Sequence, residues 1–168
     1  MGRTTLVLGG ARSGKSEVAE AIATALADTV TYVAAGEALD READPDWTAR
    51  VDAHRARRPA AWTTVEASAD LAPVLARLGG VVIVDSLGTW VASSPEFAPD
   101  ATALIDALVA RDGDTIVVSD EVGLGVHPDT AVGLAFRDAL GSVNRAVAAA
   151  ADEAWLVVAG RRLRLEAP

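Results

Sequence analysis

Eight consecutive residues near the N-terminus have the types and spacing that bind the phosphates of a nucleotide. They read Gly9-Gly10-Ala11-Arg12-Ser13-Gly14-Lys15-Ser16, which satisfies the Walker A spacing between Gly9 and Gly14-Lys15-Ser16. In such a loop the backbone amides point at phosphate oxygens, and the helix that follows adds its positive end. Lys15 would bridge the β- and γ-phosphates, and the Ser16 hydroxyl would ligate Mg²⁺. The segment therefore predicts a nucleoside triphosphate site.

The use of basic residues sets Lys15 apart from the rest of the chain. Of the fifteen lysine and arginine residues, Lys15 is the only lysine and the others are arginine. A chain that otherwise uses arginine thus has its single lysine at the phosphate-binding position of the motif.

A carboxylate that could share the metal with Ser16 follows a strongly apolar run. The residues Val81-Val82-Ile83-Val84-Asp85 are typical of a central strand that ends in an acid at the ligand-binding edge of a sheet. A lone aspartate after a strand is more often a turn or cap residue. The phosphate loop in the same chain favours a role for Asp85 as a magnesium ligand.

One of the two histidines lies among regularly spaced arginines. In a helix over residues 46–57, Arg50 and His54 would share a face with Arg58, which would suit a polyphosphate. Neighbouring cations disfavour the imidazolium form, so His54 would stay neutral and able to act as a nucleophile. The alternative is a solvent-exposed basic helix with an incidental histidine. His127 lies in a predicted loop with no basic partners nearby, and we assign it no chemical role.

Strand-like and helical segments alternate along the chain, which indicates repeated βα units. We expect strands at 4–8, 30–34, 81–84, 115–119 and 154–159, and helices at 15–26, 46–57, 71–78, 101–111 and 131–151. Edge strands are expected at 62–65 and 163–165, the latter as an antiparallel hairpin across 160–162. The predicted fold is an α/β three-layer sandwich like that of P-loop NTPases, with a mainly parallel central sheet and antiparallel edge strands.

Composition limits the classes of function. At 168 residues, of which 51% are hydrophobic, the chain fits a single nucleotide-binding domain over residues 1–168. A net charge of -9 argues against nucleic acid as a partner, because that binding relies on basic side chains. No apolar run reaches a membrane-spanning length and no signal peptide is recognisable, so we expect a cytoplasmic protein without a membrane span. The absence of cysteine excludes disulfides and thiolate metal sites.

Five segments together resemble the bifunctional adenosylcobinamide kinase/adenosylcobinamide-phosphate guanylyltransferases. They span nearly the whole chain in order: the 9–16 loop, the 50–58 segment with His54, 62–66, Asp120-Glu121-Val122-Gly123-Leu124-Gly125 and Phe136-Arg137-Asp138. Phosphate loops alone are widespread, but this combination is highly specific.

The resemblance implies two reactions in cobalamin biosynthesis. ATP or GTP phosphorylates the aminopropanol hydroxyl of adenosylcobinamide, and a histidine then carries GMP from GTP to adenosylcobinamide phosphate, which gives adenosylcobinamide-GDP. His54 occupies the position of that histidine, and Mg²⁺ is the expected cofactor. Besides the 9–16 loop, the resemblance implies nucleotide contacts at Ala34, Ala35, Gly36, Arg55, Ala56, Arg57, Arg58, Glu66 and Asp85.

The chain differs from many members of the family that it resembles at three positions. Many relatives have Cys at the position of Ser86 and Asn at the position of Asp120. Many also have Asn near the position where this chain has Ser93. None of these departures removes a residue assigned to catalysis. The family also forms homo-oligomers, commonly trimers, so we expect a homo-oligomer here.

Three other classes of function can use a phosphate loop. A regulatory GTPase switch would read guanine with an Asn-Lys-x-Asp element, and the only lysine already lies in the phosphate loop. A kinase for another metabolite would transfer phosphate without forming a covalent nucleotide. A non-catalytic interaction domain would bind nucleotide without turnover.

Overall fold

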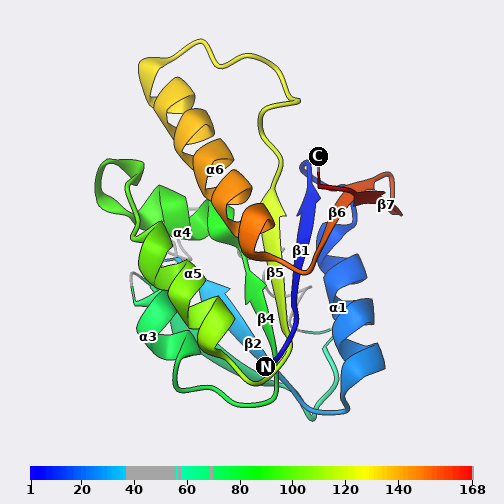
Figure 1. Ribbon diagram of the computed structural model, residues 1–168. Helices are drawn as coiled ribbons and strands as arrows, with labels where there is room; N and C mark the ends of the chain where they lie inside the picture. Colours follow the sequence, from blue (N-terminus) through cyan, green and yellow to red (C-terminus); the bar gives the residue numbers. More distant parts are fainter. Residues whose placement is uncertain (37–55, 57, 69, 168) are drawn as a thin grey trace.

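The computed structural model of the chain describes residues 1–36, 56, 58–68 and 70–167. Figure 1 shows a central sheet with helices on both faces. The sheet has seven strands in the order β3-β2-β4-β5-β1-β6-β7. Because β1 lies between β5 and β6, the phosphate loop that follows it leaves from the interior of the sheet.

The strands pair in parallel except at one edge. Their bounds are β1 (Thr4–Gly9), β2 (Val30–Ala35), β3 (Thr63–Ala67), β4 (Val81–Asp85), β5 (Thr115–Asp120), β6 (Glu153–Val158) and β7 (Arg161–Leu165). The mainly parallel sheet is confirmed, and its antiparallel edge pairing is that of β6 with β7. At the opposite edge β3 pairs in parallel with β2. The hairpin turn comes earlier than predicted, since β7 already begins at Arg161.

The helices form the two outer layers. They are α1 (Lys15–Leu26), α3 (Leu71–Leu75), α4 (Leu87–Ser93), α5 (Ala101–Ala110) and α6 (Ala131–Ala150), with a short 3-10 helix at Pro95–Phe97. In Figure 1, α1 covers one face of the sheet, and α3 to α6 cover the other. Among the described residues, no helix is both long and apolar enough to span a membrane.

Apolar residues fill both faces of the central strands. In β1, Leu6 and Leu8 belong to the core beneath α3 to α6, whereas Val7 belongs to the core beneath α1. Successive side chains of a strand point to opposite faces, so a strand covered on both sides must be apolar throughout. This burial explains why the predicted strands are continuous apolar runs.

Helix α4 was not predicted, and it begins directly after the end of β4. The Ser86 hydroxyl accepts a hydrogen bond from the Thr89 amide at 3.4 Å and caps the helix. The predicted helix at 71–78 ends at Leu75. The predicted helix at 46–57 lies outside the described residues except for Ala56, which is helical.

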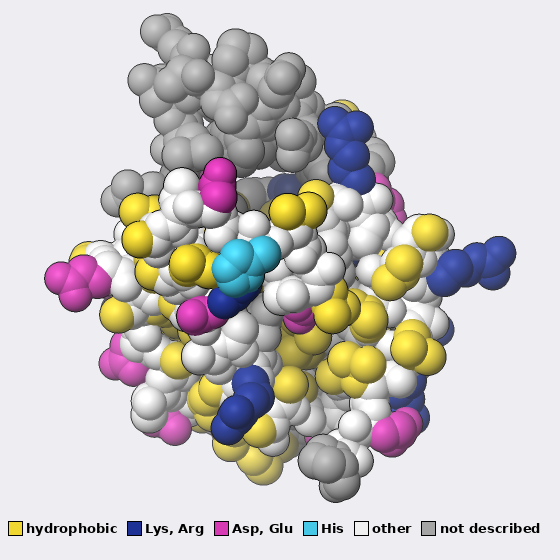
Figure 2. Space-filling view, turned by 90° about the horizontal axis from the view of Figure 1, so that it is seen from above, with side chains coloured by type: hydrophobic (Ala, Val, Ile, Leu, Met, Phe, Trp, Pro, Cys, Tyr) yellow, Lys and Arg dark blue, Asp and Glu magenta, His cyan; other side chains and the backbone are white. Residues whose placement is uncertain are grey.

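Parallel pairing brings the carboxyl ends of the strands to one edge. The register pairs Gly9 with Asp120, and it pairs Ala34 with both Asp85 and Glu66. Figure 2 looks down on this edge, where acidic, basic and apolar side chains lie close together. The sheet thus gathers most of the described candidate residues in one region, as open α/β sheets do for their ligands.

Candidate active site

The phosphate loop curls between β1 and α1. The Ser13 amide donates to the Gly10 carbonyl at 3.3 Å, and Gly14 has a positive φ of 91° that favours glycine. A Cβ at Gly14 would also lie 3.2 Å from the Cα of Gly160. The amide of Gly160, in the turn of the β6–β7 hairpin, donates to the Ser13 carbonyl at 2.7 Å. The loop therefore has a fixed backbone shape that is tethered to the hairpin.

Lys15 is held by two oxygen atoms at the base of the loop. Its ammonium group lies 2.7 Å from a carboxylate oxygen of Asp120 and donates to the Gly10 carbonyl at 3.2 Å. The Lys15 side chain is 13% exposed and that of Asp120 is 34% exposed. The cation predicted to contact phosphates is thus positioned inside the loop and paired with the carboxylate at the end of β5.

The two predicted metal ligands lie next to each other. The Ser16 hydroxyl donates to Asp85 Oδ2 at 3.4 Å, and it comes from the first turn of α1 while Asp85 ends β4. The Tyr32 hydroxyl donates a short hydrogen bond to the same carboxylate oxygen. Hydroxyl and carboxylate oxygens are the hard ligands that Mg²⁺ prefers, so this donor set fits the expected ion. Among the described residues, no cluster of three or more acidic or histidine side chains suits a metal.

Tyr32 is buried and remains protonated. Burial raises the pKa of its phenol most, and the negative charge and hydrogen bond of Asp85 raise this pKa further. The guanidinium of Arg58 opposes these effects and stacks 3.3 Å from the centre of the Tyr32 ring. Arg58 also donates to the Thr64 hydroxyl at 3.2 Å, while its Nε is buried without a partner in the described structure. Arg58 thus lies one side chain away from Asp85.

The predicted contacts after β2 lie beside α4. Ala34 of β2 lies opposite Asp85 of β4 on one side and opposite Glu66 of β3 on the other. The Ala35 carbonyl accepts a short hydrogen bond from the Thr89 hydroxyl. Gly36 has a φ of 98°, and a Cβ there would lie 2.6 Å from the Thr89 carbonyl oxygen. The end of β2 is therefore packed closely against α4 beside the Asp85 centre.

Three predicted site residues lie outside the described residues. They are His54, Arg55 and Arg57. Arg50, which belongs to the predicted helical face but not to the predicted site, also lies outside the described residues. Ala56 is described and exposed. The structure brings together the phosphate loop, Asp85 and Arg58, whereas the predicted role of His54 stays a prediction.

The expectation that His127 has no basic partner is wrong. Nδ1 of His127 lies 3.0 Å from Nη1 of Arg137. Nη2 of the same arginine forms an ion pair with Asp138 at 2.8 Å. Arg137 is ten residues further along the chain and reaches the loop from α6. Proximity of this kind arises from tertiary packing, which local sequence does not indicate.

Two residues of the candidate site, Asp120 and Tyr32, were not predicted from the sequence. Asp120 carries the same signal as Asp85, because it ends the apolar strand Thr115–Asp120. Tyr32 carries no comparable signal, since an aromatic residue inside a strand is ordinarily part of the core. Its partnership with Asp85 depends on the pairing of β2 with β4.

Comparison with protein families gives a match over nearly the full chain. Residues 5–165 match the family model described as cobinamide kinase / cobinamide phosphate guanyltransferase. Bifunctional adenosylcobalamin biosynthesis protein CobU of Salmonella typhimurium is 37% identical, over 96% of this chain and 98% of that protein. Bifunctional adenosylcobalamin biosynthesis protein CobP of Pseudomonas aeruginosa is 36% identical, over 96% of each chain.

Solved structures support the fold. An ATPase of a bacterial type III secretion system superposes with a TM-score of 0.58 at 13% identity, covering 93% of this chain and 51% of the ATPase. The ATPase EscN of enteropathogenic E. coli gives a TM-score of 0.57 at 12% identity, covering 94% of this chain and 43% of EscN. The predicted P-loop NTPase-like fold is confirmed.

Proposed function

The chain belongs to the cobinamide kinase / cobinamide phosphate guanyltransferase family, and we propose that its phosphate loop binds the triphosphate for phosphoryl transfer and that His54 is the nucleophile of GMP transfer. The chain is a bifunctional enzyme of adenosylcobalamin biosynthesis. It phosphorylates adenosylcobinamide and transfers GMP to the phosphorylated product. The assignments of residues to these steps are our proposal.

In the kinase step, the phosphate loop holds the triphosphate of ATP or GTP. The hydroxyl oxygen of adenosylcobinamide forms a bond to the γ-phosphorus as the bond to the β–γ bridging oxygen breaks. The nucleoside diphosphate leaves with that electron pair, and the hydroxyl proton goes to solvent. Lys15 and the loop amides neutralise the charge on the phosphates, which is the main requirement of phosphoryl transfer. Lys15 exchanges Asp120 for a phosphate oxygen when the nucleotide binds.

Ser16 and Asp85 are the residues that would hold Mg²⁺. The 3.4 Å contact between their oxygen atoms supports this assignment. When bound, Mg²⁺ would neutralise charge on the β- and γ-phosphates. Tyr32 would orient the carboxylate of Asp85 through its hydroxyl.

In the transferase step, we assign the nucleophile to His54. An imidazole nitrogen forms a bond to the α-phosphorus of GTP, and pyrophosphate leaves with the electron pair of the broken P–O bond. A phosphate oxygen of adenosylcobinamide phosphate then displaces the imidazole and gives adenosylcobinamide-GDP. The observation that best supports a shared site is the stacking of Arg58 on Tyr32, whose hydroxyl bonds Asp85. This chain of contacts links the end of the basic segment to the metal-ligand candidates.

Mass spectrometry of the intact protein after incubation with GTP and Mg²⁺ tests the transferase assignment. We expect a mass increase of one GMP, acid-labile as a phosphoramidate, that is lost in His54→Ala. His127→Ala is the matched control, because it removes the only other histidine and should keep the adduct. An unmodified protein, or an adduct that persists in His54→Ala, would remove His54 from the mechanism.

We further propose that the protein is a cytoplasmic homo-oligomer. Three apolar side chains of the β6–β7 hairpin are exposed, Val158, Leu163 and Leu165, and Leu163 is 64% exposed. A second copy of the chain would remove them from water. Sedimentation equilibrium tests the assembly, and a monomer at micromolar concentration would contradict it.

A further inference from the structure

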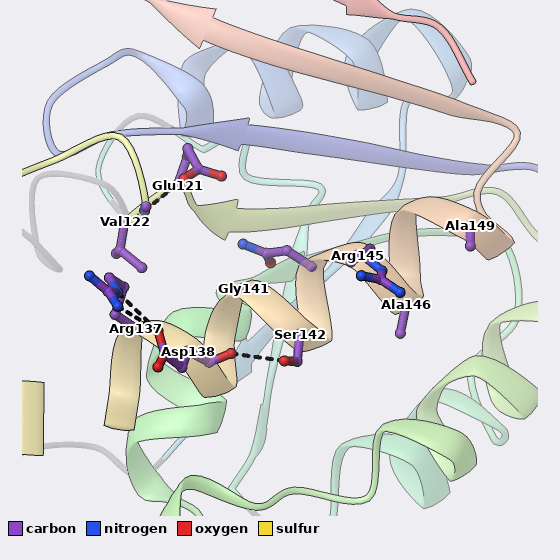
Figure 3. Close-up of a pocket in the computed structure, with 11 residues that line it drawn as sticks. Glu121, Val122, Arg137, Asp138, Gly141, Ser142, Arg145, Ala146 and Ala149 are labelled. Carbon is purple, nitrogen blue, oxygen red and sulfur yellow. Dashed lines mark hydrogen bonds and ion pairs between the residues drawn. The ribbon is translucent and has the colours of Figure 1, made fainter. Parts of the chain in front are cut away.

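An open cavity lies between the loop that follows β5 and one face of α6. Its volume is about 860 Å³, and Figure 3 shows its lining. On α6, Asp138, Ser142, Arg145 and Ala149 recur every three or four residues and therefore share a face. A pocket of this size is in the range of small-molecule sites. None of the residues predicted to bind the nucleotide or Mg²⁺ lines this cavity.

The cavity adjoins the phosphate loop. Glu121 lines it, and the Glu121 amide donates to the carbonyl of Gly9, the first loop residue, at 3.0 Å. The preceding residue is Asp120, whose carboxylate pairs with Lys15. A molecule bound in the cavity would therefore lie next to the γ-phosphate end of the predicted triphosphate site.

The wall between the cavity and the loop is rigidly built. Asn144 is 5% exposed, and its amide donates to the Asp120 carbonyl at 3.0 Å and accepts from the Ser119 hydroxyl at 2.6 Å. On the other side, a Glu121 carboxylate oxygen accepts from the Gly123 amide at 2.7 Å. These bonds fix the wall before any ligand arrives, which reduces the entropic cost of binding.

The lining suits a bulky molecule with a polar rim better than a second triphosphate. Gly141, Ala146 and Ala149 leave an open, largely apolar surface on α6, while Arg145 offers hydrogen-bond donors. The Ser142 hydroxyl already donates to the Asp138 carbonyl at 2.9 Å, so its oxygen is left as an acceptor. The other lining arginine, Arg137, is already paired with Asp138 at 2.8 Å. Glu121 and Asp138 add negative charge that opposes a polyanion.

We propose that this cavity binds the corrin macrocycle of adenosylcobinamide, the acceptor in both reactions. The proposal rests on the proposed function, which makes a bulky, amide-rimmed macrocycle the partner of the triphosphate. With the ring against α6, the aminopropanol arm can extend past Asp120 to the phosphate loop. The same bound position serves the second reaction, because the phosphorylated arm leaves from the same edge of the ring.

Filling the cavity tests the proposal. Ala149→Trp and Ala146→Trp place a large ring on its α6 wall, and Ala149 is exposed, so the fold tolerates the change. Ala25→Trp is the matched control, because Ala25 is exposed on α1, on the other face of the sheet. We expect both cavity variants to raise the KM for adenosylcobinamide by about tenfold or more. The KM for ATP and the yield of guanylylated protein should match those of Ala25→Trp.

Direct binding separates this proposal from the proposed function. Equilibrium dialysis of adenosylcobinamide, followed by its visible absorbance, should show weaker binding by Ala149→Trp than by Ala25→Trp, whether or not His54 is guanylylated. Unchanged corrinoid affinity in both cavity variants would overturn the proposal. A parallel loss of nucleotide affinity would also overturn it, as would a change in oligomeric state, since the cavity would then belong to the nucleotide or to a subunit contact.

Discussion

Lys15 and Asp120 form an ion pair of 2.7 Å across the phosphate site, between the start of α1 and the end of β5. The cation predicted to bind triphosphate is therefore already engaged by a carboxylate. A triphosphate bound as proposed would compete with Asp120 for the ammonium group of Lys15, and the charge of Asp120 would oppose the incoming polyanion. We therefore expect Asp120 to influence nucleotide affinity, a role that was not predicted from the sequence.

Asp120→Asn should tighten the binding of ATP in the absence of metal. The Lys15–Asp120 pair is partly exposed, so its loss should make the free energy of ATP binding more favourable by about 0.2–1 kcal/mol. Removal of the negative charge acts in the same direction. Titration calorimetry of the variant and the unchanged protein measures the difference. Weaker binding by the variant would instead make Asp120 a supporting contact of the nucleotide.

Lys15→Ala should severely reduce both activities. Loss of the ammonium group removes charge neutralisation at the phosphates, which is worth roughly 10²–10³ in rate for one such donor. The measurements are nucleoside diphosphate release with adenosylcobinamide and guanylylation with GTP. Kinase turnover at the original rate would show that the phosphates bind elsewhere.

Asp85→Asn and Ser16→Ala should each raise the Mg²⁺ concentration needed for half-maximal kinase rate. Each variant removes or weakens one oxygen ligand of the predicted ion, and the carboxylate contributes the larger charge. Metal-free ATP should bind Asp85→Asn at least as well as it binds the original chain, because a negative charge is lost. An unaltered Mg²⁺ dependence in both variants would contradict the metal assignment.

Tyr32→Phe should change how stability depends on alkaline pH. The folded state raises the pKa of Tyr32 above the unfolded value of about 10, so above that pH only the unfolded state releases the proton. The free energy of unfolding should therefore fall as pH rises through and beyond about 10, by up to about 1.4 kcal/mol per pH unit from this group. Below that range the contribution of Tyr32 is fully present.

Urea denaturation at several alkaline pH values measures this slope, which should be shallower in Tyr32→Phe than in the original chain. Tyr32 is the only tyrosine, so phenolate absorbance reports its ionisation directly. The absorbance should rise only when the protein unfolds. A phenolate signal in the folded protein near pH 10 would show that Tyr32 is not protected in the way the structure indicates.

The sequence predicted the central strands because burial on both faces demands apolar runs. The segment Val81–Asp85 is an example, and its final carboxylate could be assigned to the ligand-binding edge. Helix α4 was missed because its sequence, Leu-Gly-Thr-Trp-Val-Ala-Ser, is short and contains glycine and β-branched residues of low helix propensity. Its stability comes from the Ser86 cap and from the burial of Leu87, Trp90 and Val91.

Contacts between distant strands account for the rest of the site. Asp120 meets Lys15 only because β5 lies beside β1, and Tyr32 meets Asp85 only because β2 lies beside β4. Strand order is set by the packing of the whole chain, and neither residue has a local pattern that indicates its partner. The phosphate loop could be assigned because all of its groups are consecutive in sequence.

The hydrogen bond from the Gly160 amide to the Ser13 carbonyl joins the last hairpin of the chain to the centre of the phosphate loop. Any displacement of that hairpin must pull on the loop backbone or break this bond. If subunits associate through the hairpin, dilution and nucleotide affinity become thermodynamically linked quantities. Triphosphate binding would then promote assembly to the same degree that assembly strengthens triphosphate binding.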